Sequence, residues 1–150
     1  MLFAVFLLQS MNPLDIEGVW WTRGGNAQVE IEETGSSVRG TIIWTSAAAE
    51  VAAGRMVKKD DLPDVYRIGK VLFEDYDRGA DRWENGTIYS LEDGKAYASS
   101  LRRVDEETLA VEGCLGIFCR TQLFTRASDD EIERLQLVRS AAVLVERPAP

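Results

Sequence analysis

Hydrophobic and polar residues alternate along most of this chain with the two-residue period of a half-buried β-strand. In the clearest example, Ala27, Val29 and Ile31 alternate with Gln28, Glu30 and Glu32. Similar short runs recur at intervals of about 8–12 residues, separated by glycine-rich or acidic turns. The pattern predicts strands over residues 17–22, 27–32, 38–44, 71–76, 82–89, 95–104, 108–113 and 117–126.

This spacing predicts an all-β fold, because βαβ units would need helical patterns between the strands. Consecutive hairpins favour an up-and-down antiparallel β-barrel of about eight strands over residues 17–126, since closure removes the unpaired edges of a sheet. Alternation and turn spacing alone do not separate a barrel from a β-sandwich. The inward, apolar side of the third strand is expected to carry Val38, Gly40, Ile42 and Trp44.

Two later segments depart from the strand pattern. Residues 47–66 form a long loop, of a length that is usually functional or mobile in a compact domain. Residues 128–146 are predicted to be a C-terminal helix, because Ser128 and Glu131 have the spacing of a capping box. Its apolar stripe is expected to pack on the barrel wall, or alternatively to dock a partner, and consists of Ile132, Leu135, Val138, Ala142 and Val145.

The N-terminal residues 1–10 contain an uninterrupted apolar run at 2–8. This run is too short to span a bilayer, which needs about 20 residues, but it has the length of a signal-peptide core. No basic residue precedes it, since the first cation is Arg23. We interpret it as a truncated signal peptide and expect no membrane span in the mature protein. The alternative is an N-terminal strand or helix that packs on the domain.

The charge and residue composition exclude several classes of function. A net charge of −8 disfavours nucleic acid and anionic membrane surfaces as partners. The absence of histidine removes Ser-His-Asp and Cys-His catalysis and most catalytic zinc sites. We therefore expect a protein that is not an enzyme and holds no cofactor or metal. An enzyme that uses carboxylates alone is the remaining catalytic hypothesis.

Cys114 and Cys119 are the two cysteines of the chain. A hairpin loop of four residues between them would place them opposite each other, at a separation compatible with a disulfide. Two free buried thiols or a redox couple are the alternatives, although the spacing is not the Cys-x-x-Cys of thioredoxin-like proteins.

Aromatic residues are the stronger indication of a binding site. An eight-stranded barrel is either filled by side chains or holds one small ligand, and aromatic rings serve both purposes. Arg120 and Gln122 share one face of the last strand, and if that face points inward they need polar partners or a polar or anionic ligand. The candidate ligand-binding residues are Trp44, Trp83, Tyr89, Tyr97, Arg120 and Gln122.

Several motifs occur in a fixed order between residues 17 and 126. They are Gly18-Val19-Trp20-Trp21-Thr22, Gly25-x-Ala27-x-Val29-x-Ile31, Arg39-Gly40-x-Ile42-x-Trp44, Trp83-x-x-Gly86-Thr87-Ile88-Tyr89, Glu92-Asp93-Gly94-Lys95-x-Tyr97, Val111-x-Gly113 with Gly116, and Arg120-Thr121-Gln122-x-x-Thr125-Arg126. In this order they resemble the bacterial domain-of-unknown-function family 2147. The resemblance implies a periplasmic or secreted protein with a lipocalin-like, calycin-type barrel, for which a small ligand is the usual suggestion.

The Gly-x-Trp motif of the first strand also resembles the lipocalin hallmark. That resemblance implies a structural barrel closure in which Trp20, which follows Gly18, plugs one end and Arg126 packs over it in a cation–π contact. The sequence departs from the family pattern in two places. Residues 36–39 lack the cysteines often found around the second turn, and the helical tail is not expected.

The leading hypothesis is a periplasmic lipocalin-like protein that binds a small, partly apolar molecule in its barrel. The alternative is a structural or interaction module of the cell envelope, with a filled barrel and no ligand. Such a module would contact an envelope protein or a second copy of the chain through the barrel exterior, residues 47–66 or the tail helix.

Overall fold

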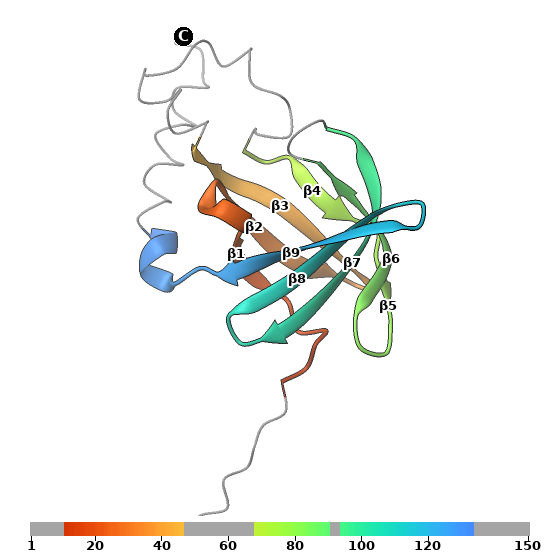
Figure 1. The fold of residues 1–150 in the computed structure, drawn as a ribbon. Coiled ribbons are helices and arrows are strands. Elements are labelled where there is room, and N and C mark those ends of the chain that lie inside the picture. The colour runs from red at the N-terminus through yellow and green to blue at the C-terminus, as the bar shows by residue number, and fades with distance from the viewer. Residues whose placement is uncertain (1–10, 47–67, 91–93, 134–150) are drawn as a thin grey trace, which may run out of the picture.

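One antiparallel sheet accounts for nearly all of the regular structure among the described residues (Figure 1). The computed structural model describes residues 11–46, 68–90 and 94–133. The predicted signal peptide at 1–10, the long loop at 47–66 and most of the predicted helix lie outside these residues. The strands are β1 (Gly18–Trp21), β2 (Ala27–Thr34), β3 (Ser37–Thr45), β4 (Val71–Glu74), β5 (Asp77–Arg78), β6 (Trp83–Tyr89), β7 (Ala96–Asp105), β8 (Thr108–Leu115) and β9 (Phe118–Arg126).

The sheet closes into an up-and-down barrel, as the sequence predicts. Its strand order is β4-β3-β2-β1-β9-β8-β7-β6, and β4 pairs with β6 to complete the ring. A short 3₁₀ turn, η1 (Arg23–Gly25), replaces the predicted turn between β1 and β2. Eight strands form the barrel, and the two-residue β5 is an extra strand that pairs with β6 alone among the described strands.

A β-bulge corrects the prediction for the third strand. Val38, Gly40 and Ile42 are buried on the expected side, but the register shifts between Gln28 and Val29 of β2. Val29 pairs with Ile42 while Gln28 pairs with Trp44, so the alternation of inward and outward side chains is reset at this point. Trp44 therefore faces outward, and the prediction that it points into the barrel is wrong.

A second irregularity occurs in β6, where the register shifts between Trp83 and Gly86. Asn85 adopts a φ of 58°, in the left-handed region that asparagine tolerates. A Cβ atom at Gly86 would lie 2.3 Å from the ring of Tyr76, so only glycine lets this ring pass close to the strand. The sequence Asn85-Gly86 thus marks both a bulge and a close backbone approach.

The hydrophobic core fills one end of the barrel. Its largest buried side chains are aromatic and come from both halves of the sequence: Trp20, Phe73, Tyr76, Trp83 and Phe124. The segment 11–17 runs beneath this end and contributes Leu14 and Ile16 to the same core. We call this the closed end of the barrel, and the opposite end, at the turns β1–β2 and β8–β9, the open end.

A smaller cluster lies on the outside of the barrel, where the chain leaves β9. Residues 129–133 are helical, and Ser128 and Glu131 exchange the hydrogen bonds of a capping box, as predicted. Glu131 also accepts a hydrogen bond from Trp21 Nε1 at 2.7 Å. Trp21 packs edge-to-face on Trp44, with ring centroids 5.6 Å apart. These contacts place the start of the helix against the barrel wall, while residues 134–146 of the prediction lie outside the described part.

Candidate functional site

The open end of the barrel contains a cavity of about 710 Å³ that opens to solvent. Its walls come from the inner faces of β4, β6, β7, β8 and β9, and its rim from η1 and the ends of the neighbouring strands. The described residues that line it are Thr22, Arg23, Gly24, Asn26, Leu72, Ile88, Tyr89, Ser90, Tyr97, Val111, Gly113, Leu115, Phe118, Cys119, Arg120, Gln122 and Phe124.

The level at which the barrel becomes hollow follows from two rows of inward side chains. Cross-strand pairs align Trp83, Leu101, Val111 and Gln122 in one row, where the three apolar residues are buried. The next row, one step toward the open end, is Gly86, Ser99, Gly113 and Arg120.

The side chains of this second row are too small to meet across the barrel, apart from the arginine. A Cβ atom placed on Gly113 would touch only Ile88 Cγ2, at 3.6 Å, among the atoms of the described residues. The cavity therefore begins where large inward side chains give way to glycine and serine.

Arg120 and Gln122 supply the polar groups of the cavity wall. Both lie on the inner face of β9, in register with Gly113 and Val111 of β8. Within the described residues, neither side chain makes a hydrogen bond or ion pair, and both line the cavity. Gln122 is half-buried and Arg120 is exposed at the mouth. A guanidinium and an amide therefore remain available to a polar or anionic group within the cavity.

The two tyrosines predicted as ligand-binding residues also line the cavity, but in different ways. Tyr97 is paired with Ile88 on the inner face. Tyr89 lies at the rim, and its hydroxyl donates a hydrogen bond to Glu74 Oε1 at 3.0 Å. This hydrogen bond raises the pKa of Tyr89. Glu74 also lies 3.7 Å from Arg39, so the Tyr89 hydroxyl belongs to a polar cluster beside the cavity.

The two tryptophans predicted as ligand-binding residues do not line the cavity. Trp83 is fully buried in the core of the closed end, and its Nε1 donates to the carbonyl oxygen of Leu14 at 2.9 Å. Trp44 faces outward against Trp21 because of the bulge in the β2–β3 ladder. Four of the six candidates are thus brought together by the barrel, and these two have structural positions.

Two buried hydroxyl groups, those of Tyr76 and Ser99, lie near the row of Gly86 and Gly113, where the barrel becomes hollow. Tyr76 is 2% exposed and Ser99 is 5% exposed, and neither hydroxyl has a hydrogen-bond partner of good geometry among the described residues. Burial raises the pKa of Tyr76, and the nearby Ser99 hydroxyl offsets part of that rise.

The closed end contains the three residues expected from the lipocalin hallmark. Trp20 is fully buried, and its Nε1 donates to the carbonyl oxygen of Ile16 at 2.9 Å. Arg126 lies over the indole at 5.1 Å and donates to the carbonyl oxygen of Glu17 at 3.0 Å. Gly18 has a φ of 126°, and a Cβ atom there would lie 2.7 Å from the Arg126 guanidinium.

A second arginine at this end, Arg103, was not predicted from the sequence. Its Cζ lies 5.7 Å from the Trp20 ring centroid. Its guanidinium donates to the carbonyl oxygens of Asp15, Asp105 and Glu106, at 2.8–3.2 Å. Arg103 therefore ties the N-terminal segment to the β7–β8 turn. Tyr97, Ser99 and Leu101 alternate along the inner face of β7, and Arg103 is the next residue of this series. That alternation is the sequence signal that could have identified it.

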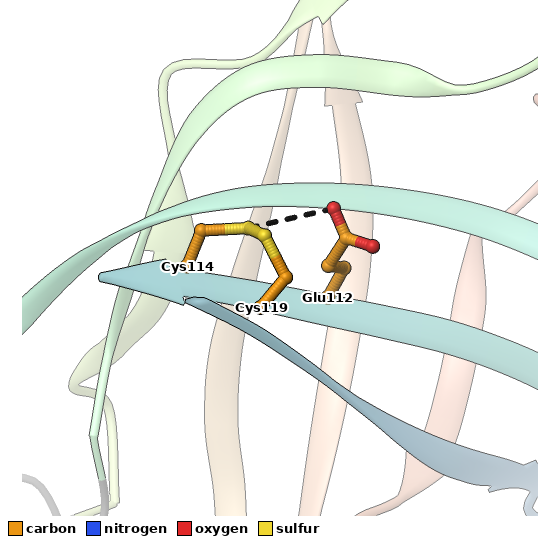
Figure 2. Close-up of a disulfide and its surroundings, with 3 residues drawn as sticks. All are labelled: Glu112, Cys114 and Cys119. Carbon is orange, nitrogen blue, oxygen red and sulfur yellow. Dashed lines mark hydrogen bonds between the residues drawn. A yellow bond between two sulfur atoms is a disulfide. The ribbon is translucent and has the colours of Figure 1, made fainter. Parts of the chain in front are cut away.

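Cys114 and Cys119 form the predicted disulfide at the open end, with Cα atoms 4.1 Å apart (Figure 2). The connecting loop is shorter than predicted, because Leu115 and Phe118 are themselves paired and only Gly116 and Ile117 form the turn. Glu112 Oε1 lies 3.5 Å from Cys114 Sγ. The three potential ligand atoms are close together, but both sulfurs are engaged in the disulfide.

Comparison with protein families matches residues 18–126 to a model described as an uncharacterized protein conserved in bacteria, DUF2147. The chain belongs to this family. A solved structure, protein HP1028 from Helicobacter pylori, is similar to this DUF2147 chain with a TM-score of 0.60 and 22% identity. The match covers 82% of this chain and 90% of HP1028, which is described as belonging to the lipocalin family.

The DUF2147 barrel is therefore lipocalin-like, as the sequence motifs implied. Comparison with curated proteins found no match. Among the described residues, no helix is long and apolar enough to cross a membrane.

Proposed function

We propose that this protein is a periplasmic or secreted binding protein that holds a small, partly apolar molecule in the open end of its barrel. The observation that carries the proposal is the cavity with Arg120 and Gln122 on its wall. Both side chains can form hydrogen bonds to a ligand without breaking a hydrogen bond or ion pair within the described residues. The expected ligand combines an apolar body with a polar or anionic group.

The size and lining of the cavity support this function over a filled barrel. Ligand sites for small molecules typically measure about 300–1,000 Å³ and combine apolar walls with a few polar groups. Here the apolar walls include Leu72, Ile88 and Phe124. No Asp or Glu occurs among the described lining residues, whereas catalysis by carboxylates would need two of them to converge.

The proposed compartment is supported by the disulfide between Cys114 and Cys119. Disulfides persist in oxidising compartments and are rare in the cytosol. The apolar run predicted as a truncated signal peptide agrees with export.

The test is to fill the cavity and measure the binding of an anionic, apolar fluorescent probe, 8-anilinonaphthalene-1-sulfonate. Gly113→Phe introduces a ring into the open space of the inner face, and we expect at least a roughly tenfold weaker Kd. Thr121→Phe adds the same ring to the exposed outer face of β9 and should leave the Kd unchanged. Thermal unfolding of both variants checks that the barrel is intact.

A second variant tests the polar part of the site. Arg120→Ala removes a charged donor at the mouth, and we expect the Kd for the same probe to rise about tenfold. Arg102→Ala, which removes an exposed arginine elsewhere on β7, is the matched control. Equal binding by the wild-type protein, Gly113→Phe and Arg120→Ala would refute the cavity as the binding site.

A further inference from the structure

The turn between β8 and β9 lies at the edge of the barrel (Figure 1). Three apolar side chains of this turn are exposed. Leu115 is 68% exposed, Ile117 is 91% exposed and Phe118 is 77% exposed. Burying such side chains in an apolar environment is favourable by about 1.5–3 kcal/mol each. Three of them within the four residues 115–118 therefore form an exposed apolar surface on a protein with a net charge of −8.

The geometry of the turn holds these side chains at the mouth of the barrel, away from the core. Gly116 adopts a φ of 60° at the first position of the two-residue turn, which is a backbone conformation suited to glycine. The Cys114–Cys119 disulfide joins the strands directly behind it. The disulfide therefore restrains the two strands from separating next to these apolar residues.

The turn adjoins the mouth of the cavity. Leu115 and Phe118 line the cavity, whereas Ile117 does not. The first charged residue behind the turn on β9 is Arg120, which is exposed at the same mouth. An arginine in this position can reach lipid phosphates while neighbouring apolar side chains lie deeper, as arginines do at membrane interfaces. No acidic residue occurs within the described residues 113–121.

The shape of this surface favours a bilayer over a second protein chain. Side chains of this size expose together on the order of 400 Å², whereas a stable protein interface buries about 800 Å² on each partner. A narrow, convex turn can enter the headgroup region of a bilayer without a complementary partner surface. The net charge of −8 argues for zwitterionic rather than anionic lipids.

We propose that the β8–β9 turn docks the protein on a lipid bilayer, with Leu115, Ile117 and Phe118 inserted at the headgroup–acyl boundary. Docking in this way places the cavity mouth against the membrane surface. An amphiphilic ligand then passes between bilayer and cavity with little exposure to water. That consequence rests on the proposed binding function, but the docking itself does not.

The experiment is flotation of the purified protein with phosphatidylcholine vesicles. Ile117→Asn removes the most exposed apolar side chain and places a turn-compatible residue there. We expect the wild-type protein to float with the vesicles and Ile117→Asn to partition about tenfold less. Val104→Asn replaces an apolar residue that is 47% exposed near the β7–β8 turn, and it should float as the wild type does.

The same variants separate docking from ligand binding. Because Ile117 does not line the cavity, Ile117→Asn should bind 8-anilinonaphthalene-1-sulfonate as the wild type does in the absence of vesicles. Absence of the wild-type protein from the vesicle fraction would overturn the docking proposal, and so would equal flotation of Ile117→Asn. A dimer in solution that Ile117→Asn dissociates, without flotation of either protein, would instead identify the turn as a protein interface.

Discussion

Side chains that point into the barrel are large and buried at its closed end, whereas several of those at its open end are small or polar. At the closed end, the indoles of Trp20 and Trp83 are fully buried, and each Nε1 donates to a carbonyl of the N-terminal segment. At the open end, Gly113 leaves space and the polar groups of Arg120 and Gln122 remain without partners in the described part of the chain. One end is therefore packed with side chains, whereas the other is an open space with polar groups on its wall.

The comparison shows how a single strand, β9, contributes to both ends of the barrel. Along β9, the inward positions run from Phe118 and Arg120 at the mouth, through Gln122 and Phe124, to Arg126 over Trp20. The two-residue period places all of them on one face, and their depth in the barrel decides what each one contacts. Arg126 is satisfied by Trp20 and a carbonyl oxygen, whereas Arg120 is not, although the two residues are only six positions apart.

The largest expected effect is at the closed end. Trp20→Ala removes a fully buried indole and its hydrogen bond to Ile16, and we expect the free energy of unfolding to fall by about 3–5 kcal/mol. Urea denaturation measures this loss. Trp44→Ala, which removes the same side chain from the outer face, should cost less than half as much. Similar losses for the two variants would contradict the division between a packed interior and a peripheral cluster.

A smaller effect is expected at the open end, where the disulfide holds the β8–β9 hairpin. The double variant Cys114→Ser/Cys119→Ser should lose about 2 kcal/mol of unfolding free energy, because the ring that the disulfide closes is short. Reduction of the wild-type protein should give the same loss in urea denaturation. A loss as large as that of Trp20→Ala would show that the open end contributes as much to folding as the closed end.

The effect that is smallest at neutral pH concerns the boundary between the two ends. Burial raises the pKa of Tyr76 above its ordinary value of about 10, so the folded protein retains this proton when the unfolded chain has lost it. The contribution of the protonated Tyr76 hydroxyl to the free energy of unfolding is therefore fully present below about pH 10. Above that pH, the free energy of unfolding falls by about 1.4 kcal/mol per pH unit because of this group.

Tyr76→Phe removes this group from the titration. Unfolding measured from pH 9 to 12 should show a shallower decline for the variant than for the wild-type protein, with little difference at pH 7. Parallel curves would show that the Tyr76 hydroxyl is in contact with water in the folded state.

Much of the fold could be predicted from local sequence signals. The alternation of Ala27, Val29 and Ile31 identified a strand with one buried face, and all three side chains are buried. The capping-box spacing of Ser128 and Glu131 located the start of the helix. These features depend on residues a few positions apart, and backbone geometry translates such spacing directly into structure.

The candidate site could be predicted only in part. Tyr97, Arg120 and Gln122 were placed on the cavity wall because alternation carries them to the inner face. Trp44 was misplaced because one bulge reverses every side chain beyond it, and the pattern of apolar residues gave no sign of that bulge. Trp83 was assigned to the inner face correctly, but its depth in the barrel makes it part of the core.

From the sequence it was possible to predict the eight barrel strands and their up-and-down order, and to favour a disulfide between the two cysteines. The trio of Gly18, Trp20 and Arg126 was implied by the resemblance to the lipocalin hallmark. Each of these depends on spacing or on a motif that can be read along one chain. The filled and the hollow end of the barrel, in contrast, could be told apart only in the folded structure. That outcome depends on which inward side chains meet across the closed sheet, and residues as distant as Gly86 and Gly113 become neighbours of the same space only after closure.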